Sequence, residues 1–258
     1  MTLERKVAIV TGGARGQGEA EATLLARKGA CVLIADVLTD EGRLLAEKLR
    51  NAGMHARFVE LDVSDPDSWR AAVAVAQEWK GRIDILVNNA GIINRSIVAN
   101  TSLAAWERVL KVNLTGAFLG IQAVAPYMAE HGDGSIINIS SNSGFSGHYD
   151  PAYTASKWGL RGLTRSAAME YASKGIRVNS VCPGLVVTEL NAKSPHLQPM
   201  IDMTPMKRSA APEEIAELVC FLASSASSFI TGEDFVIDGG FTAGAAYRRV
   251  ATETGILS

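Results

Sequence analysis

The sequence predicts an α/β fold, in which a doubly wound, seven-stranded parallel sheet is covered by helices on both faces to give a three-layer α/β/α sandwich. Short apolar runs alternate with helix-length segments along most of the chain. Several of these runs are almost continuous Val, Ile and Leu, which is typical of strands that are buried on both faces. Strand–helix–strand repeats of this kind place successive strands parallel to one another. Because no linker interrupts the repeats, we expect a single domain over residues 1–258.

The apolar runs give the expected strands, and the segments between them give the expected helices. The strands are expected at Lys6–Thr11, Cys31–Asp36, Ala56–Leu61, Ile83–Asn88, Ser135–Ser140, Arg177–Cys182 and Phe235–Asp238. The helices are expected at Gly16–Lys28, Asp40–Asn51, Asp65–Trp79, Leu103–Glu130 and Pro151–Ser173.

Two segments depart from this alternation. Thr188–Ala211 contains three prolines and three methionines without a clear period, so we expect a substrate lid at about residues 188–211, either flexible or irregularly helical. Ala243–Ser258 follows Gly239 and Gly240 without a pattern. We expect it to be a tail that packs against a neighbouring subunit.

The composition is that of an ordinary globular protein and excludes several kinds of partner. Hydrophobic residues make up 47% of the chain and the net charge is −2, whereas a nucleic-acid-binding protein normally carries a basic surplus. No stretch approaches the ~20 apolar residues that span a bilayer, and Val7–Val10 is too short for the core of a signal peptide. Three scattered cysteines, Cys31, Cys182 and Cys220, indicate a reducing compartment. We therefore expect a cytoplasmic protein that binds neither membranes nor nucleic acids.

A glycine-rich turn follows the first expected strand and opens the first expected helix. Its glycines, Gly12, Gly16 and Gly18, permit positive φ and let the backbone approach a pyrophosphate, which can rest on the helix N-terminus. Arg15 and Gln17 lie in the same turn. The spacing is Gly-x-x-x-Gly-x-Gly and not the common Gly-x-Gly-x-x-Gly fingerprint, so a turn that binds no ligand is the alternative.

Asp36 ends the second expected strand, where dinucleotide-binding folds place the carboxylate that reads the adenosine ribose. A carboxylate there accepts hydrogen bonds from both ribose hydroxyls and repels the 2′-phosphate of NADP. Arg15 would favour NADP, but Asp36 is expected to lie directly at the 2′ position. We therefore expect NAD as the cofactor, and a strand-capping aspartate without this role is the alternative.

Tyr153 and Lys157 are four residues apart and lie on one face of an expected helix. A phenol has a pKa of ~10, which is too high for a base at neutral pH. A fixed cation and the positive nicotinamide ring would lower that pKa toward the working range. The pair would then perform proton transfer with Tyr153 as the general acid/base, although a pair of this kind also arises by chance.

These residues and several others, taken in order, resemble the short-chain dehydrogenase/reductase family. The motifs run from Val7 to Gly240 and are Thr11–Gly18, Leu61-Asp62-Val63, Asn88-Asn89-Ala90-Gly91, Asn113 within Lys-Val-Asn-Leu-Thr-Gly, Ser140-Ser141, Tyr153 with Lys157, Pro183-Gly184 and Asp238-Gly239-Gly240. Each motif is modest alone, but their joint order and spacing make coincidence negligible. The resemblance implies a Rossmann-like fold and an NAD(H)-dependent oxidoreductase that interconverts a secondary alcohol and a ketone by hydride transfer.

The resemblance also implies a role for each matching residue. Tyr153 would exchange the substrate proton, and Lys157 would hold the nicotinamide ribose and lower the tyrosine pKa. Asn113 would hold a water that links Lys157 to solvent. The further cofactor-binding residues implied in this way are Asp62, Val63, Asn89, Gly91, Pro183, Val186 and Thr188. No metal site is expected.

A catalytic serine is implied as well, but two ways of counting select different residues. Thirteen residues before the tyrosine is Ser140, whereas three residues before Gly144 is Ser141. We prefer Ser141, because the following loop can shorten by one residue while a strand end cannot slip without reversing every side chain. Ser143 is a third candidate, and we expect it to line the pocket.

Some residues near the expected site depart from the family or allow two interpretations. Gln17 stands where the family usually has a small aliphatic residue, so we expect altered contacts with the nicotinamide-side phosphate but not lost binding. His148, in the loop before the tyrosine, is more typical of solvated surface than of a pocket. The lid methionines Met200, Met203 and Met206 would form either a pliable pocket wall or an ordinary packed lid.

The motifs favour an NAD-linked hydroxysteroid or cyclic-alcohol dehydrogenase acting on a small-molecule alcohol or ketone. Alternatives within the family are a 3-oxoacyl-thioester reductase, a sugar dehydrogenase and an enol-forming relative. An alternative of another class is a non-catalytic dinucleotide-binding sensor or scaffold. The family usually assembles through two long helices and the last strand, so we expect a homotetramer.

Overall fold

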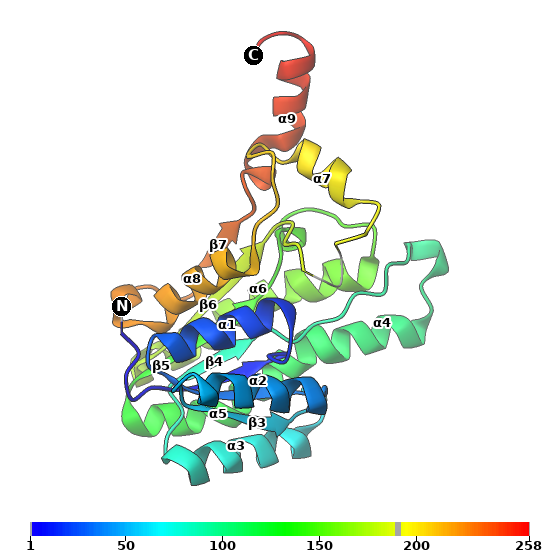
Figure 1. Cartoon of the computed structure of the whole chain (residues 1–258). Coiled ribbons are helices and arrows are strands. Elements are labelled where there is room, and N and C mark those ends of the chain that lie inside the picture. The colour runs from blue at the N-terminus through cyan, green and yellow to red at the C-terminus, as the bar shows by residue number, and fades with distance from the viewer. Residues whose placement is uncertain (1, 189–191, 258) are drawn as a thin grey trace.

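Seven parallel strands form one sheet in the computed structural model, which describes residues 2–188 and 192–257 (Figure 1). The strands are β1 (Val7–Thr11), β2 (Cys31–Asp36), β3 (Ala56–Glu60), β4 (Ile85–Asn88), β5 (Gly134–Ile139), β6 (Ile176–Pro183) and β7 (Asp234–Ile237). Their order is β3-β2-β1-β4-β5-β6-β7, and every neighbouring pair is parallel. The predicted doubly wound sheet is confirmed, and each predicted strand overlaps an observed one.

Helices cover both faces of the sheet. They are α1 (Gly16–Arg27), α2 (Thr39–Asn51), α3 (Pro66–Lys80), α4 (Leu103–Leu110), α5 (Gly116–His131), α6 (Pro151–Tyr171), α7 (Leu197–Met203), α8 (Pro212–Ala223) and α9 (Phe241–Glu253). Short 3₁₀ turns are η1 (Val98–Asn100), η3 (Asn142–Gly144), η4 (Ala172–Lys174) and η5 (Ser225–Ser227), and η2 (Lys111–Thr115) is a π-helical turn.

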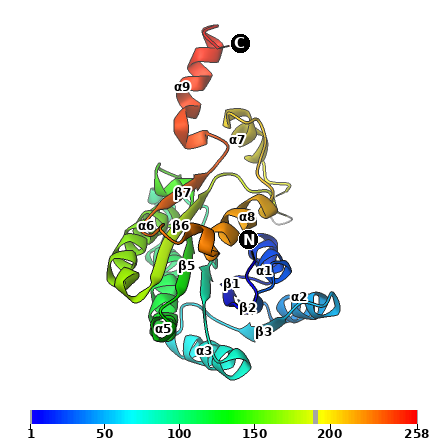
Figure 2. The same cartoon turned by 90° about the vertical axis from the view of Figure 1, so that its left-hand side faces the viewer.

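Alternate strand residues point into two separate apolar cores. Ala8 and Val10 of β1 join the core beneath α1, α2 and α8, whereas Ile9 joins the core beneath α3, α5 and α6. This two-residue period is the geometry of a pleated strand. The three predicted layers are therefore observed, with the sheet between the two helix layers (Figure 2).

Buried amides connect the central strands to the helix that carries the tyrosine. Asn88 Nδ2 on β4 donates to Asn138 Oδ1 on β5 at 2.8 Å. Asn138 Nδ2 donates in turn to Thr164 Oγ1 on α6 at 2.9 Å. Because such polar groups are costly to leave unpaired, this chain of bonds fixes α6 against the sheet.

The predicted helix over Leu103–Glu130 is observed as one helical stretch over Leu103–His131, in which the π-helical turn η2 lies between α4 and α5. Asn113 lies inside η2 and is buried. Its side chain accepts from the Ile92 N–H at 2.8 Å and donates to the Ile92 carbonyl at 2.9 Å. A π turn adds a residue to the helix and re-aims a side chain, which is why such turns recur at functional sites.

By length and composition alone, the helical stretch Leu103–His131 could cross a membrane. Its inward residues Ile121, Val124 and Met128 are instead buried in the core beneath α3, α5 and α6. We interpret this stretch as a core helix.

The last third of the chain is more helical than predicted. Helix α8 was not expected, although Pro212 at its first turn and the Glu214 carboxylate that accepts from the Ala211 N–H at 2.9 Å are ordinary start signals. The patternless tail expected at Ala243–Ser258 is wrong, because helix α9 covers Phe241–Glu253.

The Asp238 side chain caps the start of α9, because its two carboxylate oxygens accept from the Gly240 and Thr242 N–H groups. Both views show α9 projecting away from the sheet layers (Figures 1 and 2). Packing of this segment on a neighbouring subunit stays a prediction. Within the predicted lid, residues 189–191 lie outside the described residues, and α7 supplies the helical part.

Candidate active site

The site lies where the strand order reverses, between the carboxyl ends of β1 and β4, which is where open α/β sheets bind ligands. The glycine-rich turn connects β1 to α1 here. Gly12 and Gly16 both have φ of 61°, which favours glycine. A Cβ on Gly18 would lie 2.1 Å from the Gly12 carbonyl oxygen, so only glycine allows this close passage.

The start of α1 is open toward this turn. Its N-cap residue, Arg15, makes no side-chain capping bond, so the first N–H groups of the helix have no side-chain acceptor there. Free N–H groups at a helix N-terminus bind phosphate oxygens. The turn therefore fits the pyrophosphate of a dinucleotide.

A first cavity of about 630 Å³ extends from this turn. It is bounded by residues of the turn, the end of β2 and the segments that follow β3 and β4: Gly12, Arg15, Gly16, Gln17, Gly18, Asp36, Val37, Leu38, Leu61, Asp62, Val63, Ser64, Asn89, Ala90, Gly91, Ile92, Arg108, Lys111, Val112 and Thr188. Most of the predicted cofactor residues are thus brought together. The additional residues come mainly from α4, η2 and the ends of strands, for which the sequence carries no separate signal.

Asp36 is buried at the end of β2 and lines this cavity. Its Oδ2 accepts from the Ala14 N–H at 3.0 Å, and its Oδ1 accepts from the Leu38 N–H at 3.1 Å. These bonds hold the carboxylate against the turn while each oxygen keeps acceptor capacity. Arg15 is exposed on the same cavity wall.

Hydrogen bonds of Asp62, Trp69 and Asn89 fix the part of the cavity wall that follows β3 and β4. Asp62 Oδ1 accepts from the Ser64 N–H at 2.9 Å and its hydroxyl at 2.7 Å, and these bonds lower the pKa of Asp62. Behind it, the fully buried Trp69 donates its indole N–H to the Val63 carbonyl at 2.9 Å. Asn89 Nδ2 donates to the Thr11 carbonyl at 3.0 Å, which ties β4 to the turn.

A second cavity of about 360 Å³ adjoins the first. Gln17, Asn89, Gly91 and Ile92 line both cavities. The other residues that line the second cavity are Ile93, Arg95, Ile139, Ser140, Ser141, Asn142, Ser143, His148, Tyr153, Lys157, Pro183, Gly184, Leu185, Val186, His196 and Met200. A dinucleotide in the first cavity would therefore reach toward the predicted catalytic residues in the second.

Tyr153 lies in the first turn of α6, and that turn is fixed by Asp150. Asp150 Oδ1 accepts from the Tyr153 N–H at 3.1 Å, and Pro151 follows as the first helical residue. This is the favoured start of a helix, an acidic N-cap followed by proline. Asp150 is fully buried, and the sequence analysis did not single it out.

The structure separates the two candidate serines. The Ser140 hydroxyl donates to the Lys157 carbonyl at 3.0 Å, so it is engaged behind the site. The Ser141 hydroxyl donates to Asn142 Oδ1 at 3.4 Å, accepts from the Ser143 N–H at 3.1 Å and lines the second cavity together with Tyr153. The geometry thus favours Ser141, and Ser143 lines the cavity beside it.

Burial raises the pKa of Tyr153, and the hydrogen bond from Ser141 lowers it by less. Lys157, which was expected to lower this pKa, is not among the groups that do so in the protein by itself. The Lys157 ammonium lies 5.5 Å from the centre of the tyrosine ring and donates to the Ile139 carbonyl at 2.8 Å. Burial also lowers the pKa of Lys157 to about 8. Lowering the phenol pKa would therefore depend on the positive charge of a bound nicotinamide ring.

Asn113 and Lys157 approach the same glycine. A Cβ on Gly91 would lie 3.5 Å from Asn113 Oδ1 and 3.6 Å from Lys157 Nζ. Asn113 Nδ2 also donates to Ser156 Oγ at 3.1 Å. The π-helical turn η2 thereby brings the predicted asparagine beside the predicted lysine.

His148 is in the wall of the second cavity, so the solvated-surface interpretation is wrong. Its ring lies edge-on to Tyr153 with 5.6 Å between the ring centres. Its Nδ1 accepts from the Asp150 N–H at 3.1 Å, and burial lowers its pKa. Of the lid methionines, Met200 lines the cavity, whereas Met206 is exposed.

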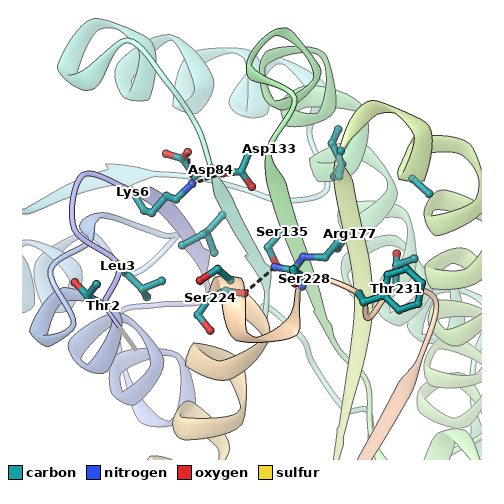
Figure 3. A pocket seen from close by; sticks show the side chains of 17 residues that line it. Thr2, Leu3, Lys6, Asp84, Asp133, Ser135, Arg177, Ser224, Ser228 and Thr231 are labelled. Atoms are coloured by element: carbon teal, nitrogen blue, oxygen red, sulfur yellow. Dashed lines mark hydrogen bonds and ion pairs between the residues drawn. The ribbon is translucent and has the colours of Figure 1, made fainter.

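A third cavity, of about 510 Å³, lies at the opposite edge of the sheet. Lys6 reaches toward Asp84 and Asp133 there, and Arg177 donates to the Ser224 carbonyl (Figure 3). These charges are paired, and no predicted catalytic residue lines this cavity. It is remote from the chemistry.

Comparisons with known proteins agree with this geometry. A family model described as enoyl-(acyl carrier protein) reductase matches residues 12–242. The chain belongs to the short-chain dehydrogenase/reductase family. Members of this family use nicotinamide dinucleotide cofactors, which the two adjoining cavities suit.

Similar proteins of this family include two enzymes and one solved structure. The chain is 48% identical to trans-4-hydroxycyclohexanecarboxylate dehydrogenase of Sinomonas cyclohexanicum, over 96% of this chain and 97% of that protein. It is 47% identical to 3-alpha-(or 20-beta)-hydroxysteroid dehydrogenase of Mycobacterium bovis, over 94% and 91%. The crystal structure of gox2181 superposes with a TM-score of 0.91 at 39% identity, over 94% and 97%. The chain is therefore an oxidoreductase of this dehydrogenase family.

Proposed function

We propose that this protein is an NAD(H)-dependent oxidoreductase that interconverts a secondary alcohol and a ketone, with Tyr153 as general acid/base. One observation carries the proposal. Tyr153 and Ser141 line a cavity that shares Gln17, Asn89, Gly91 and Ile92 with a larger cavity fit for a dinucleotide.

Each catalytic side chain has a different role in alcohol oxidation. The Ser141 hydroxyl holds the substrate oxygen, and the Tyr153 phenolate takes the hydroxyl proton as the carbonyl forms. Lys157 grips the nicotinamide ribose, and Asn113 supports the proton path from Lys157 to solvent. NAD⁺, when bound, supplies the hydride acceptor. In the reverse direction Tyr153 returns the proton to the ketone oxygen.

Asp36 supports NAD over NADP. Its carboxylate is buried at the adenosine end of the first cavity, where a 2′-phosphate would bring a second negative charge. Arg15 lies on the same wall, but it is exposed and therefore more screened. Asp62, Val63, Asn89 and Thr188 would complete the adenosine and ribose contacts, and Pro183 and Val186 the nicotinamide contacts.

Cyclic secondary alcohols are the substrate class that the relatives support. The two enzymes named above act on a hydroxycyclohexanecarboxylate and on hydroxysteroids. A cavity of about 360 Å³ with Ile93, Leu185 and Met200 in its wall has apolar surface for a ring. The substrate panel described below also tests three other activities. These are reduction of an oxoacyl thioester, oxidation of a sugar, and the enoyl reduction named in the family description.

We also propose a single cytoplasmic domain with a substrate lid at residues 188–211 that assembles as a homotetramer. Apolar side chains exposed on α5, α6 and α9, including Phe118, Trp158 and Tyr247, support subunit contacts. Oligomer interfaces cover such surface.

Tyr153→Phe tests the proposed function, since it removes only the phenolic oxygen. Turnover of cyclohexanol by the purified protein with NAD⁺ should fall by about 10²–10⁴, because the proton acceptor is lost. NADH affinity should stay within a few-fold. Tyr149→Phe is the matched control, because Tyr149 is exposed and does not line either cavity.

The wild-type panel decides between the competing functions. Cyclohexanol, a hydroxysteroid, a sugar alcohol, a 3-hydroxyacyl thioester and an enoyl thioester are compared by formation or consumption of NADH. Activity with the enoyl thioester alone would replace alcohol oxidation by double-bond reduction. NADH binding without turnover of any member would establish the non-catalytic alternative. A Tyr153→Phe variant that keeps more than about a tenth of the rate would move the proton transfer to another group, with His148 the next candidate.

A further inference from the structure

The ionisable side chains that line the second cavity are mainly basic. Its lining contains Arg95, Lys157 and two histidines, and no aspartate or glutamate is among the lining residues that the structure describes. The whole chain, in contrast, carries a net charge of −2. Lys157 is already bonded to the Ile139 carbonyl, which leaves Arg95 as the permanent cation whose role the proposed mechanism does not explain.

Arg95 is held in an unfavourable backbone conformation. Its φ is 58°, in the left-handed region, which is unfavourable for a non-glycine residue. The buried carboxylate of Asp150 maintains it, since Oδ2 accepts from the Arg95 N–H at 2.8 Å and from the Asn94 N–H at 2.7 Å. The same carboxylate fixes the first turn of α6 through the Tyr153 N–H. One buried group therefore sets the positions of both Arg95 and Tyr153.

The Arg95 guanidinium has no hydrogen-bond or ion-pair partner within the described part of the chain. Arg95 is exposed at the cavity, and no hydrogen bond or ion pair of its side chain is found among residues 2–188 and 192–257. An arginine without an internal partner presents its planar donor fork to whatever enters the cavity. The Asp150 carboxylate does not neutralise it by contact, because that carboxylate bonds the backbone N–H groups.

The two histidines add donors beside Arg95. His148 accepts at Nδ1 from the Asp150 N–H, so its neutral ring carries its proton on Nε2. His196, which precedes α7, lines the same cavity. The histidine rings and one arginine therefore offer donors suited to an oxyanion.

We propose that Arg95 binds a carboxylate on the substrate, so that the preferred substrates are hydroxy or keto acids in which the acid lies away from the reacting carbon. The proposal rests on the proposed function for the identity of the reacting group. The anion site itself depends only on the second cavity. Arg95 is a specificity-determining residue, and Asp150 is the positioning residue that holds it.

Binding of an unreactive pair of probes tests the site apart from turnover. Cyclohexanecarboxylate and cyclohexanecarboxamide have the same shape and differ in charge, and neither carries a hydroxyl to oxidise. Calorimetric titrations are made on the full-length protein with and without saturating NADH. The wild type should bind the carboxylate about tenfold more tightly than the carboxamide. This is the lower end of the range that a charge-assisted hydrogen bond contributes, because Arg95 is exposed.

Arg95→Gln should remove that preference while leaving carboxamide affinity within about twofold. Arg95→Lys should keep part of the preference, since it retains the charge but loses the planar fork. Arg27→Gln is the matched control, because Arg27 is an exposed arginine in the last turn of α1 and lines neither cavity. Circular dichroism confirms that each variant is folded.

Equal affinity of the wild type for both probes, or a preference that survives in Arg95→Gln, would overturn the anion site. Failure of the proposed function has a different signature: no alcohol is oxidised, yet Arg95-dependent carboxylate binding persists. Oxidation of cyclohexanol with no carboxylate preference gives the reverse result, in which the function stands and the anion site is rejected.

Discussion

Glu21 gives the clearest stability prediction, since it is a carboxyl buried in α1 without a cation. Its Oε1 accepts from Gln17 Nε2 at 2.9 Å, and its Oε2 has no hydrogen-bond partner within the described residues. Burial raises the pKa of Glu21 from its ordinary 4.5 to about 8, and the Gln17 bond lowers it by less. At neutral pH Glu21 therefore keeps its proton in the folded protein and loses it on unfolding.

The sign and size of the effect follow from linkage. A raised folded-state pKa contributes stability that is complete below the unfolded value of 4.5 and is lost as the pH rises through about 8. The two pKa values differ by about 3.5, and each unit corresponds to ~1.36 kcal/mol, so the full loss is about 5 kcal/mol. At pH 7 about 3 kcal/mol of it has been lost.

Glu21→Gln removes the titration while keeping an acceptor for Gln17. We expect the free energy of unfolding of the variant, relative to wild type, to rise by about 1.4 kcal/mol for each pH unit between pH 5 and 8. Chemical denaturation at one fixed protein concentration measures this difference. Glu47→Gln, on the exposed face of α2, is the control for a simple charge change. Parallel stability profiles for wild type and Glu21→Gln would refute a protonated buried carboxyl at this position.

Three further predictions concern the site and the assembly. Asp36→Asn should reduce the NAD(H) over NADP(H) ratio of kcat/KM at least tenfold, because it removes the charge that repels a 2′-phosphate; an unchanged ratio, measured with both cofactors, would contradict the role of Asp36. Asp150→Asn should destabilise the protein by about 2 kcal/mol or more, because one amide oxygen replaces two acceptors for three N–H groups. It should also raise the KM for substrate more than that for NAD, and denaturation and steady-state kinetics check both effects. The homotetramer should be found by light scattering at micromolar concentration, where a monomer would exclude it.

The sheet was predictable mainly because strands such as β1, β2 and β4 are buried on both faces and therefore appear as apolar runs. The β2 strand begins and ends at the predicted residues, Cys31 and Asp36. Helix α9 was missed because Gly239, Gly240 and Gly244 look like a chain leaving the fold, although the Asp238 carboxylate that caps the helix start is a local signal.

Residues of the candidate site were predictable where a motif carries them, but not where two distant segments meet. The sequence places Asp150 before Pro151 at a helix start, yet nothing in it shows that the same carboxylate reaches Arg95, 55 positions away. The choice between Ser140 and Ser141 needed the bond from Ser140 to the Lys157 carbonyl. Burial raises the pKa of Tyr153, and the packing that causes this is not described by a linear motif.

Because of the π-helical turn η2, the site depends on the number of residues in Lys111–Thr115. A π-helical turn holds one residue more than a regular α-helical turn, so removing one residue from Lys111–Thr115 would restore a regular α-helix there. The apolar stripe of α5 would keep its place in the core, but Asn113 would leave Ile92 and Ser156. A one-residue deletion here should therefore disrupt the site, even though helical content barely changes. At this turn the spacing of the residues matters as much as their chemistry.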